Sequence, residues 1–170
     1  DANNVRLPLV ALFGVGMAIT IDVIGLFLTG DFWITPELFS LFSIAEDNTI
    51  AAFDNSIIVW VIAFIFMALL QPIAEELVFR GVIYPAARAS LGAWTGFSMT
   101  AILYALFHVL AYLTIAPTDF TRVWYGIIVA LLDGLVITAV RGITGSTRAA
   151  IVAHAAFGAF AVLKAFTLTG

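Results

Sequence analysis

Five long apolar runs limit what this chain of 170 residues can fold into. Each run approaches or exceeds the roughly 20 residues that a helix needs to cross a bilayer. Backbone N–H and C=O groups inside lipid must find partners within the protein, and a helix supplies them within one segment. We therefore expect an all-α, polytopic membrane helix bundle, a single integral membrane domain over residues 1–170. The expected transmembrane helices lie at residues 7–28, 56–89, 94–113, 123–140 and 149–166.

The composition excludes several classes of function. Hydrophobic residues make up 63% of the chain, whereas a soluble domain is nearer half apolar. The chain has no cysteine, which excludes disulfides, thiolate nucleophiles and cysteine-ligated metals. The net charge is −4 and there is no basic run, so we expect membrane lipid and no nucleic acid as partner.

The basic residues predict how the chain is oriented. With a cytoplasmic N-terminus, only Arg122 and Lys164 fall outside, and the other five basic residues lie on or near the inside. This agrees with the positive-inside rule. We predict an integral protein of the cell (inner) membrane, with its C-terminus on the outer side.

The acidic segment 31–55 contains five acids, several aromatic residues and no Lys or Arg. It predicts an extracytoplasmic loop with a short amphipathic helix on the membrane interface. Pro36 suits the first turn of such a helix, and Thr35 suits its N-cap.

Two carboxylates and one guanidinium interrupt the second apolar run. Ionisable residues in a membrane segment are costly, so they usually face a partner or a watery cavity. Glu75 and Glu76 point about 100° apart on a helix and cannot share one role. Glu76 and Arg80 are spaced i, i+4, which predicts an ion pair. Glu75 is then free to take a proton from water; the alternative is that both acids are simply interfacial.

Two histidines, His108 and His154, fall within later apolar runs. Each alone fits a hydrogen-bonded core residue. Together with the glutamate pair, they suit polarisation of a water and stabilisation of an oxyanion. Zinc also accepts such ligands, but there is no His-Glu-x-x-His motif, so we expect no metal and no cofactor. Haem or pigment binding through an axial histidine is an unsupported alternative.

We interpret several other residues in or near the apolar runs mainly as structural. Asp22 lies either near the interface or inside the bundle. Asp133 reaches the site or pairs with an arginine, and we interpret it as structural. Pro72 predicts a bend in the second helix, because proline removes a helical hydrogen bond. Gly92-x-x-x-Gly96 indicates close packing or a helix cap rather than a dimer motif.

Three short motifs follow in order. Residues 75–80 read Glu-Glu-Leu-Val-Phe-Arg, residues 104–108 read Tyr-Ala-Leu-Phe-His, and residues 154–158 read His-Ala-Ala-Phe-Gly. They resemble the Glu-Glu-x-x-x-Arg, Phe-x-x-x-His and His-x-x-x-Asn motifs of the CPBP membrane proteases. That family comprises the CAAX prenyl endopeptidases and the bacteriocin-processing (Abi) proteins.

The resemblance implies an intramembrane glutamate protease with a helical core over about residues 56–163. Glu75 would be the general base that activates water, helped by His108. His154 would stabilise the oxyanion, and Glu76 and Arg80 would hold the site together. The substrate would be a membrane-associated peptide or protein, cut near the membrane surface.

The chain departs from this pattern at Gly158, where the family has Asn. Loss of one oxyanion donor typically costs about 10²–10³ in rate. The alternative is therefore a catalytically weakened member of the fold that serves as a structural or binding subunit of a larger membrane complex. Helix rise places His108 ~21 Å from Trp94 and His154 only ~9 Å from Arg148, so the two meet only if the third helix starts outside the membrane or is tilted.

Overall fold

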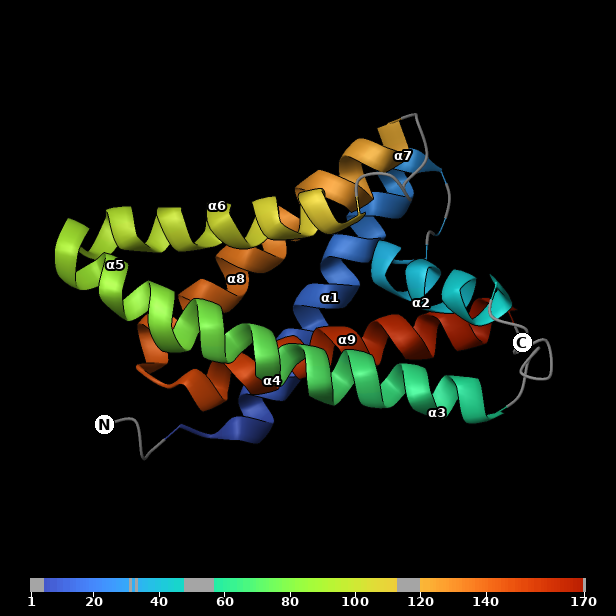
Figure 1. The fold of residues 1–170 in the computed structure, drawn as a ribbon, viewed down its shortest axis with the longest axis horizontal. Coiled ribbons are helices and arrows are strands. Elements are labelled where there is room, and N and C mark those ends of the chain that lie inside the picture. The colour runs from blue at the N-terminus through green and yellow to red at the C-terminus, as the bar shows by residue number, and fades with distance from the viewer. Residues whose placement is uncertain (1–4, 31, 33, 48–56, 113–119, 170) are drawn as a thin grey trace.

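The computed structural model describes residues 5–30, 32, 34–47, 57–112 and 120–169, and within these ranges it contains helices and no β-strand (Figure 1). Five of the described helical stretches are long and apolar enough to cross a membrane. They are Leu7–Thr29, Ile57–Leu91, Ala93–Ala111, Trp124–Thr144 and Thr147–Leu168. The prediction of an all-α polytopic bundle is confirmed.

The second spanning stretch is one long helical path with two widened turns. Each widened turn is π-helical and ends at the residue just before the dipeptide that contains a proline, Gln71-Pro72 or Tyr84-Pro85. Proline has no N–H and crowds the preceding turn, and a wider turn accommodates it without breaking the helix. The segments are α3 (Ile57–Ile65), η3 (Phe66–Leu70), α4 (Gln71–Glu76), η4 (Leu77–Ile83) and α5 (Tyr84–Leu91).

The remaining spans follow as hairpins. Gly92, at φ 88°, ends α5 and turns the chain into α6 (Ala93–Tyr112). A Cβ on Gly96 would lie 2.6 Å from the Arg88 backbone nitrogen, so both glycines of the Gly-x-x-x-Gly pattern serve capping and packing, as predicted. The later elements are α7 (Phe120–Val123), η5 (Trp124–Ile128), α8 (Val129–Thr144) and α9 (Thr147–Thr169).

The short helix α2 (Pro36–Asp47) begins at Pro36, as predicted, and packs onto the bundle, while its place on the membrane interface stays a prediction. Its Leu38 is fully buried in a core with residues of α3, η3 and α9, including Met67 and Val162. The Phe39 N–H bonds the Thr35 carbonyl, but the Thr35 hydroxyl has no partner among the described residues, so the predicted side-chain cap is not formed. The rest of the acidic segment, 48–55, and most of the loop at 114–121 lie outside the described residues.

The outer surface of the bundle carries large apolar side chains. Phe27 is 84% exposed and Leu110 is 73% exposed, as expected of side chains that face lipid. The chain is an integral membrane protein. Inside, α1 (Leu7–Thr29) packs closely on α9, and a Cβ on Gly14 would lie 2.8 Å from the Ala153 carbonyl oxygen.

The helices start at different levels. Figure 1 shows the hairpin of α5 and α6 extending well beyond the start of α9. His108 therefore lies deep in α6 while His154 lies near the beginning of α9, yet the two can be level. Because α6 starts further out than α9, the two histidines can lie close together, as the sequence analysis required.

Candidate functional site

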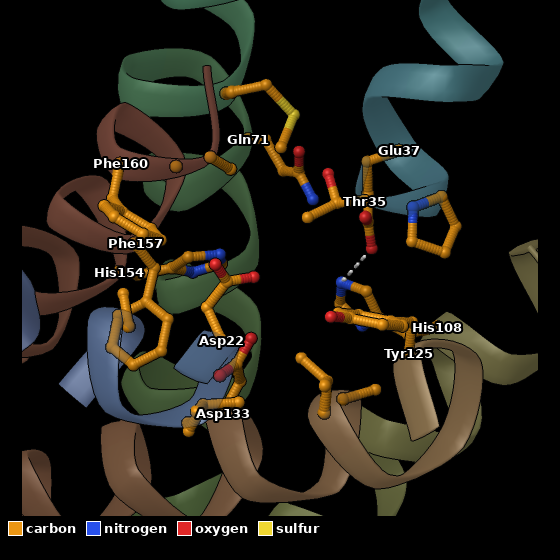
Figure 2. A pocket seen from close by; sticks show the side chains of 18 of the residues that line it. Asp22, Thr35, Glu37, Gln71, His108, Tyr125, Asp133, His154, Phe157 and Phe160 are labelled. Carbon is orange, nitrogen blue, oxygen red and sulfur yellow. Dashed lines mark ion pairs between the residues drawn. The ribbon is translucent and has the colours of Figure 1, made fainter. Parts of the chain in front are cut away.

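A cavity of about 90 Å³ with both apolar and polar side chains in its lining lies between the helices (Figure 2). This volume has room for several water molecules. Elements from the whole length of the chain line it, from α1 to α9. Its polar side chains are those of Asp22, Thr35, Glu37, Gln71, Tyr104, His108, Tyr125, Asp133, His154 and Lys164.

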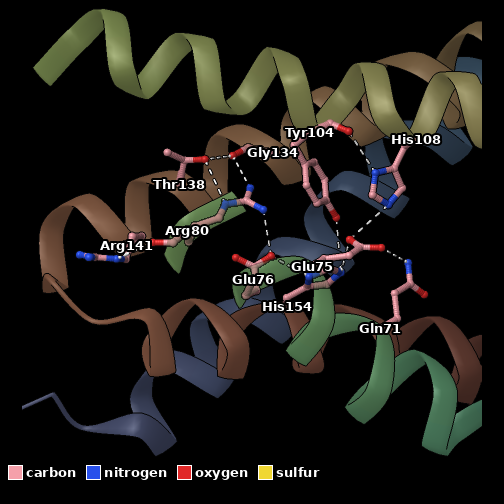
Figure 3. A network of polar contacts seen from close by, with 10 residues as sticks. All are labelled: Gln71, Glu75, Glu76, Arg80, Tyr104, His108, Gly134, Thr138, Arg141 and His154. Carbon is pink, nitrogen blue, oxygen red and sulfur yellow. Dashed lines mark hydrogen bonds and ion pairs between the residues drawn. The ribbon is translucent and has the colours of Figure 1, made fainter. Parts of the chain in front are cut away.

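Beside the cavity, Glu76 and Arg80 form the predicted ion pair. Arg80 Nη1 donates to Glu76 Oε1 at 2.9 Å, and both side chains are fully buried. The guanidinium also donates from Nη2 to the Gly134 carbonyl oxygen at 3.0 Å and from Nε to Thr138 Oγ1 at 3.3 Å. Arg80 thereby fastens η4 to α8 (Figure 3).

Glu76 also fixes one histidine. His154 Nδ1 lies 2.9 Å from the same Glu76 Oε1. A carboxylate paired with arginine accepts, so Nδ1 carries the proton and donates. The other ring nitrogen, Nε2, is left to face Tyr104 and Glu75, with the Tyr104 hydroxyl at 3.4 Å.

Glu75, on the next position of the helix, faces a different set of groups. Gln71 Nε2 donates to its Oε1 at 2.9 Å. Its Oε2 lies 3.6 Å from His108 Nε2 and 4.0 Å from His154 Nε2. The side chain is 11% exposed. Glu75 is not among the side chains that line the cavity, but both histidines near its carboxylate are.

His108 is held by its own helix. Its Nδ1 lies 3.1 Å from the Tyr104 carbonyl oxygen, and a carbonyl only accepts, so Nδ1 carries the proton. Its Nε2 faces two carboxylates, Glu75 and, at 3.9 Å, Glu37 from α2. Figure 2 shows Glu37 and His108 facing each other on the same side of the cavity.

The structure thus brings all five predicted site residues together, Glu75, Glu76, Arg80, His108 and His154. It also adds two residues that the sequence reasoning missed. The i, i+4 spacing of Gln71 and Glu75 is a local signal that could have found the first. Glu37 gives no such signal, because it lies 71 positions before His108 in the chain.

Two acids from the apolar runs also line the cavity. Asp22 is buried and pairs with Lys164 of α9, so it belongs to the bundle interior. Asp133 has one buried carboxylate oxygen, Oδ1, without a hydrogen-bond partner among the described residues, so it does not form the suggested pair with an arginine there.

Gly158 lies where α9 presses against η3. A Cβ built on it would lie only 1.9 Å from the Met67 carbonyl oxygen. In the widened turn the Gln71 N–H bonds the Phe66 carbonyl, and Pro72 has no N–H, so the Met67 carbonyl projects toward α9. Any side chain at position 158, including an amide, would collide with this backbone.

Among the residues that the structure describes, no three His, Asp or Glu side chains are arranged to hold a metal ion.

Comparison with known proteins gives one match. A family model described as "Type II CAAX prenyl endopeptidase Rce1-like" matches residues 57–160, more than half of the chain. The matched range includes all three sequence motifs and leaves out α1 and α2. None of the curated proteins and none of the solved structures compared with the chain matches it.

Proposed function

This chain belongs to the Rce1-like family of type II CAAX prenyl endopeptidases, and from that premise we propose a glutamate mechanism in which Glu75 activates water to attack a peptide bond. The CPBP-type membrane protease suspected from the motifs is confirmed at the level of the family. The residue roles and the substrate form the proposal.

The proposal rests above all on the position of the Glu75 carboxylate. Its Oε2 lies within 4.0 Å of Nε2 on both histidines, and those histidines line the cavity. Separations of 3.6 and 4.0 Å are too long for direct hydrogen bonds, and Oε2 is buried without a hydrogen-bond partner among the described residues, so a water that reached it would find an unused acceptor. A water there would touch a base and two imidazoles at once.

His154 suits the oxyanion role because of its carboxylate neighbours. Glu76 accepts from Nδ1, and Glu75 lies 4.0 Å from Nε2. In its protonated form the ring also carries a hydrogen on Nε2, and this Nε2–H can donate toward the cavity. Arg80 balances the charge of Glu76 and keeps that carboxylate in place.

The reaction follows from these positions. Glu75 accepts a proton from water as the water oxygen bonds to the carbonyl carbon, and the carbonyl electron pair moves to oxygen. His154 donates a hydrogen bond to the oxyanion. The C–N bond then breaks, and the proton held by Glu75 passes to the leaving amine, so one water is consumed.

The substrate class comes from the family description. A prenylated peptide brings its own lipid anchor, which would hold it beside a cavity within a membrane bundle. The predicted cytoplasmic N-terminus and inner-membrane location would set the face of the membrane at which cleavage occurs.

The test is cleavage of a fluorogenic farnesylated peptide ending in a CAAX sequence by the full chain in nanodiscs. The same peptide without farnesyl serves as the comparison substrate. We expect Glu75→Gln to lower kcat at least about 10³-fold, because an amide cannot accept the proton. Its unfolding temperature should match that of the wild type.

Two results would overturn the proposal. One is a folded wild-type protein that cuts neither peptide. The other is a Glu75→Gln protein that cuts as fast as the wild type.

A second candidate is a structural or binding subunit of a membrane complex, and Gly158 favours it. This glycine supports close helix packing at the position of the family's amide donor. Under this reading, Glu75→Gln leaves co-purification of partner subunits unchanged.

A further inference from the structure

The third motif cannot supply an amide donor in this chain. The Met67 carbonyl oxygen occupies the space into which a side chain at Gly158 would project. The site still needs groups that stabilise a developing oxyanion if it hydrolyses peptides. The described residues around His154 Nε2 offer one candidate, the Tyr104 hydroxyl.

Tyr104 stands in the second motif, where the family pattern has Phe, so its hydroxyl is an addition to that pattern. The hydroxyl lies 3.4 Å from His154 Nε2, and Tyr104, His154 and Gly158 line the same cavity. Figure 3 shows the Tyr104 side chain pointing toward Glu75 and His154. The hydroxyl thus occupies the space that His154 Nε2 faces.

The ring that carries this hydroxyl is held from several sides. Tyr104 is 2% exposed. The Arg80 guanidinium lies 4.3 Å from its centroid, the Phe79 ring packs edge-on at 5.3 Å and the His108 ring lies 4.3 Å away. A donor fixed in this way needs little reorganisation when charge develops, which is what makes such donors effective.

Proton positions make the hydroxyl a donor. His154 Nδ1 donates to Glu76, so in the neutral ring Nε2 accepts, and the Tyr104 O–H points to it. The O–H can rotate about its C–O bond. When Nε2 is protonated, it no longer accepts, and both N–H and O–H can point to a third atom between them.

We propose that Tyr104 is a catalytic residue that donates its O–H to the substrate oxyanion in place of the amide that Gly158 excludes. The inference rests on the proposed function, because it names a role in that reaction. Tyr104 keeps its proton throughout. The proton from water still goes to Glu75 and then to the leaving amine.

The experiment compares two tyrosines. Tyr104→Phe removes only the hydroxyl and keeps the ring that touches Arg80 and His108. The matched control is Tyr84→Phe, which removes another buried hydroxyl, one that accepts from Arg88 at 3.3 Å and lies away from the cavity. With the farnesylated peptide in nanodiscs, we expect Tyr104→Phe to lower kcat about 10²–10³-fold with KM within about twofold. Tyr84→Phe should leave both unchanged.

A rescue variant separates donation from packing. The amino group of 4-aminophenylalanine at position 104 is also a donor and should recover kcat to within about tenfold of the wild type. Failure of this variant to recover kcat, where Tyr104→Phe has lost it, overturns the donor role. A wild-type kcat for Tyr104→Phe overturns it as well.

A second readout does not depend on cleavage. The chain has only two histidines, so ¹⁵N-histidine labelling reports both rings separately. We expect Tyr104→Phe to shift the Nε2 resonance of His154, whereas Tyr84→Phe should not. An unmoved resonance overturns the contact. A wild-type protein that cuts nothing overturns the proposed function instead, and the catalytic role of Tyr104 with it.

Discussion

Glu75 and Glu76 are neighbours in the chain, but they lie in two different environments. Glu76 is fully buried, contacts the Arg80 guanidinium and accepts from His154 on the same oxygen. Glu75 is 11% exposed, and the Gln71 amide contacts it while two imidazoles lie 3.6 and 4.0 Å away; among the described residues no Lys or Arg forms an ion pair with it.

The difference separates a carboxylate that holds the fold from one that is available for chemistry. Breaking a buried ion pair leaves an uncompensated charge, so Glu76 is committed to its partners. Buried carboxylates without a paired cation are costly and gather at functional sites. Glu75 is a carboxylate of this kind. The position of each glutamate on the helix decides which one pairs with Arg80 and which one faces the imidazoles.

Removing the cation should have the largest effect on the fold. Arg80→Met leaves Glu76 buried without its partner, and we expect the free energy of unfolding to fall by about 3–5 kcal/mol. Denaturant unfolding in detergent micelles measures it. The double variant with Glu76→Gln should recover part of the loss. A loss in the free energy of unfolding below about 1 kcal/mol for Arg80→Met would mean that the Glu76–Arg80 pair does not hold the fold.

The contact between α9 and η3 should be the next most sensitive. Gly158→Ala places a methyl group against the Met67 carbonyl, and overpacking of this kind costs about 1–3 kcal/mol. Gly16→Ala is the control, because nothing lies within 4 Å of its added methyl group. The free energies of unfolding of the two variants, measured under the same conditions, test this expectation. Equal stability would show that the close approach at Gly158 is not required.

On the Glu75 side, we expect effects on rate rather than stability. Glu37→Gln removes one of the two carboxylates that face His108 Nε2. We expect kcat to fall about tenfold, or ~1.4 kcal/mol in the barrier, with the unfolding temperature unchanged. Steady-state cleavage of the farnesylated peptide measures the rate. An unaltered kcat would remove Glu37 from the site.

The smallest effect concerns the outer edge of the Glu76 network. Thr138→Val removes the hydroxyl that accepts from Arg80 Nε, which should cost about 1 kcal/mol of stability and leave kcat unchanged. Thr20→Val is the comparison, since that exposed hydroxyl donates to the carbonyl of Gly16 in its own helix. A drop in kcat for Thr138→Val would blur the distinction between the two glutamates.

The sequence by itself determined features that depend on local spacing. Run length and hydropathy gave the spanning helices, because a bilayer requires about 20 apolar residues whatever they pack against. The spacing of Glu76 and Arg80 gave the ion pair, since i, i+4 side chains meet on any helix. The glycines at 92 and 96 likewise indicated a helix cap and close packing, which the structure shows.

Only the tertiary structure decided which distant side chains meet. Local pattern suggested a short amphipathic helix beginning at Pro36, and only the packing decides that it buries Leu38 and brings Glu37 to His108. Met67 and Gly158 touch because a π-helical turn projects one carbonyl toward α9, a detail that spacing does not encode. Such contacts depend on the relative level and rotation of whole helices, which are set by the sum of many packing contacts rather than by any one stretch of sequence.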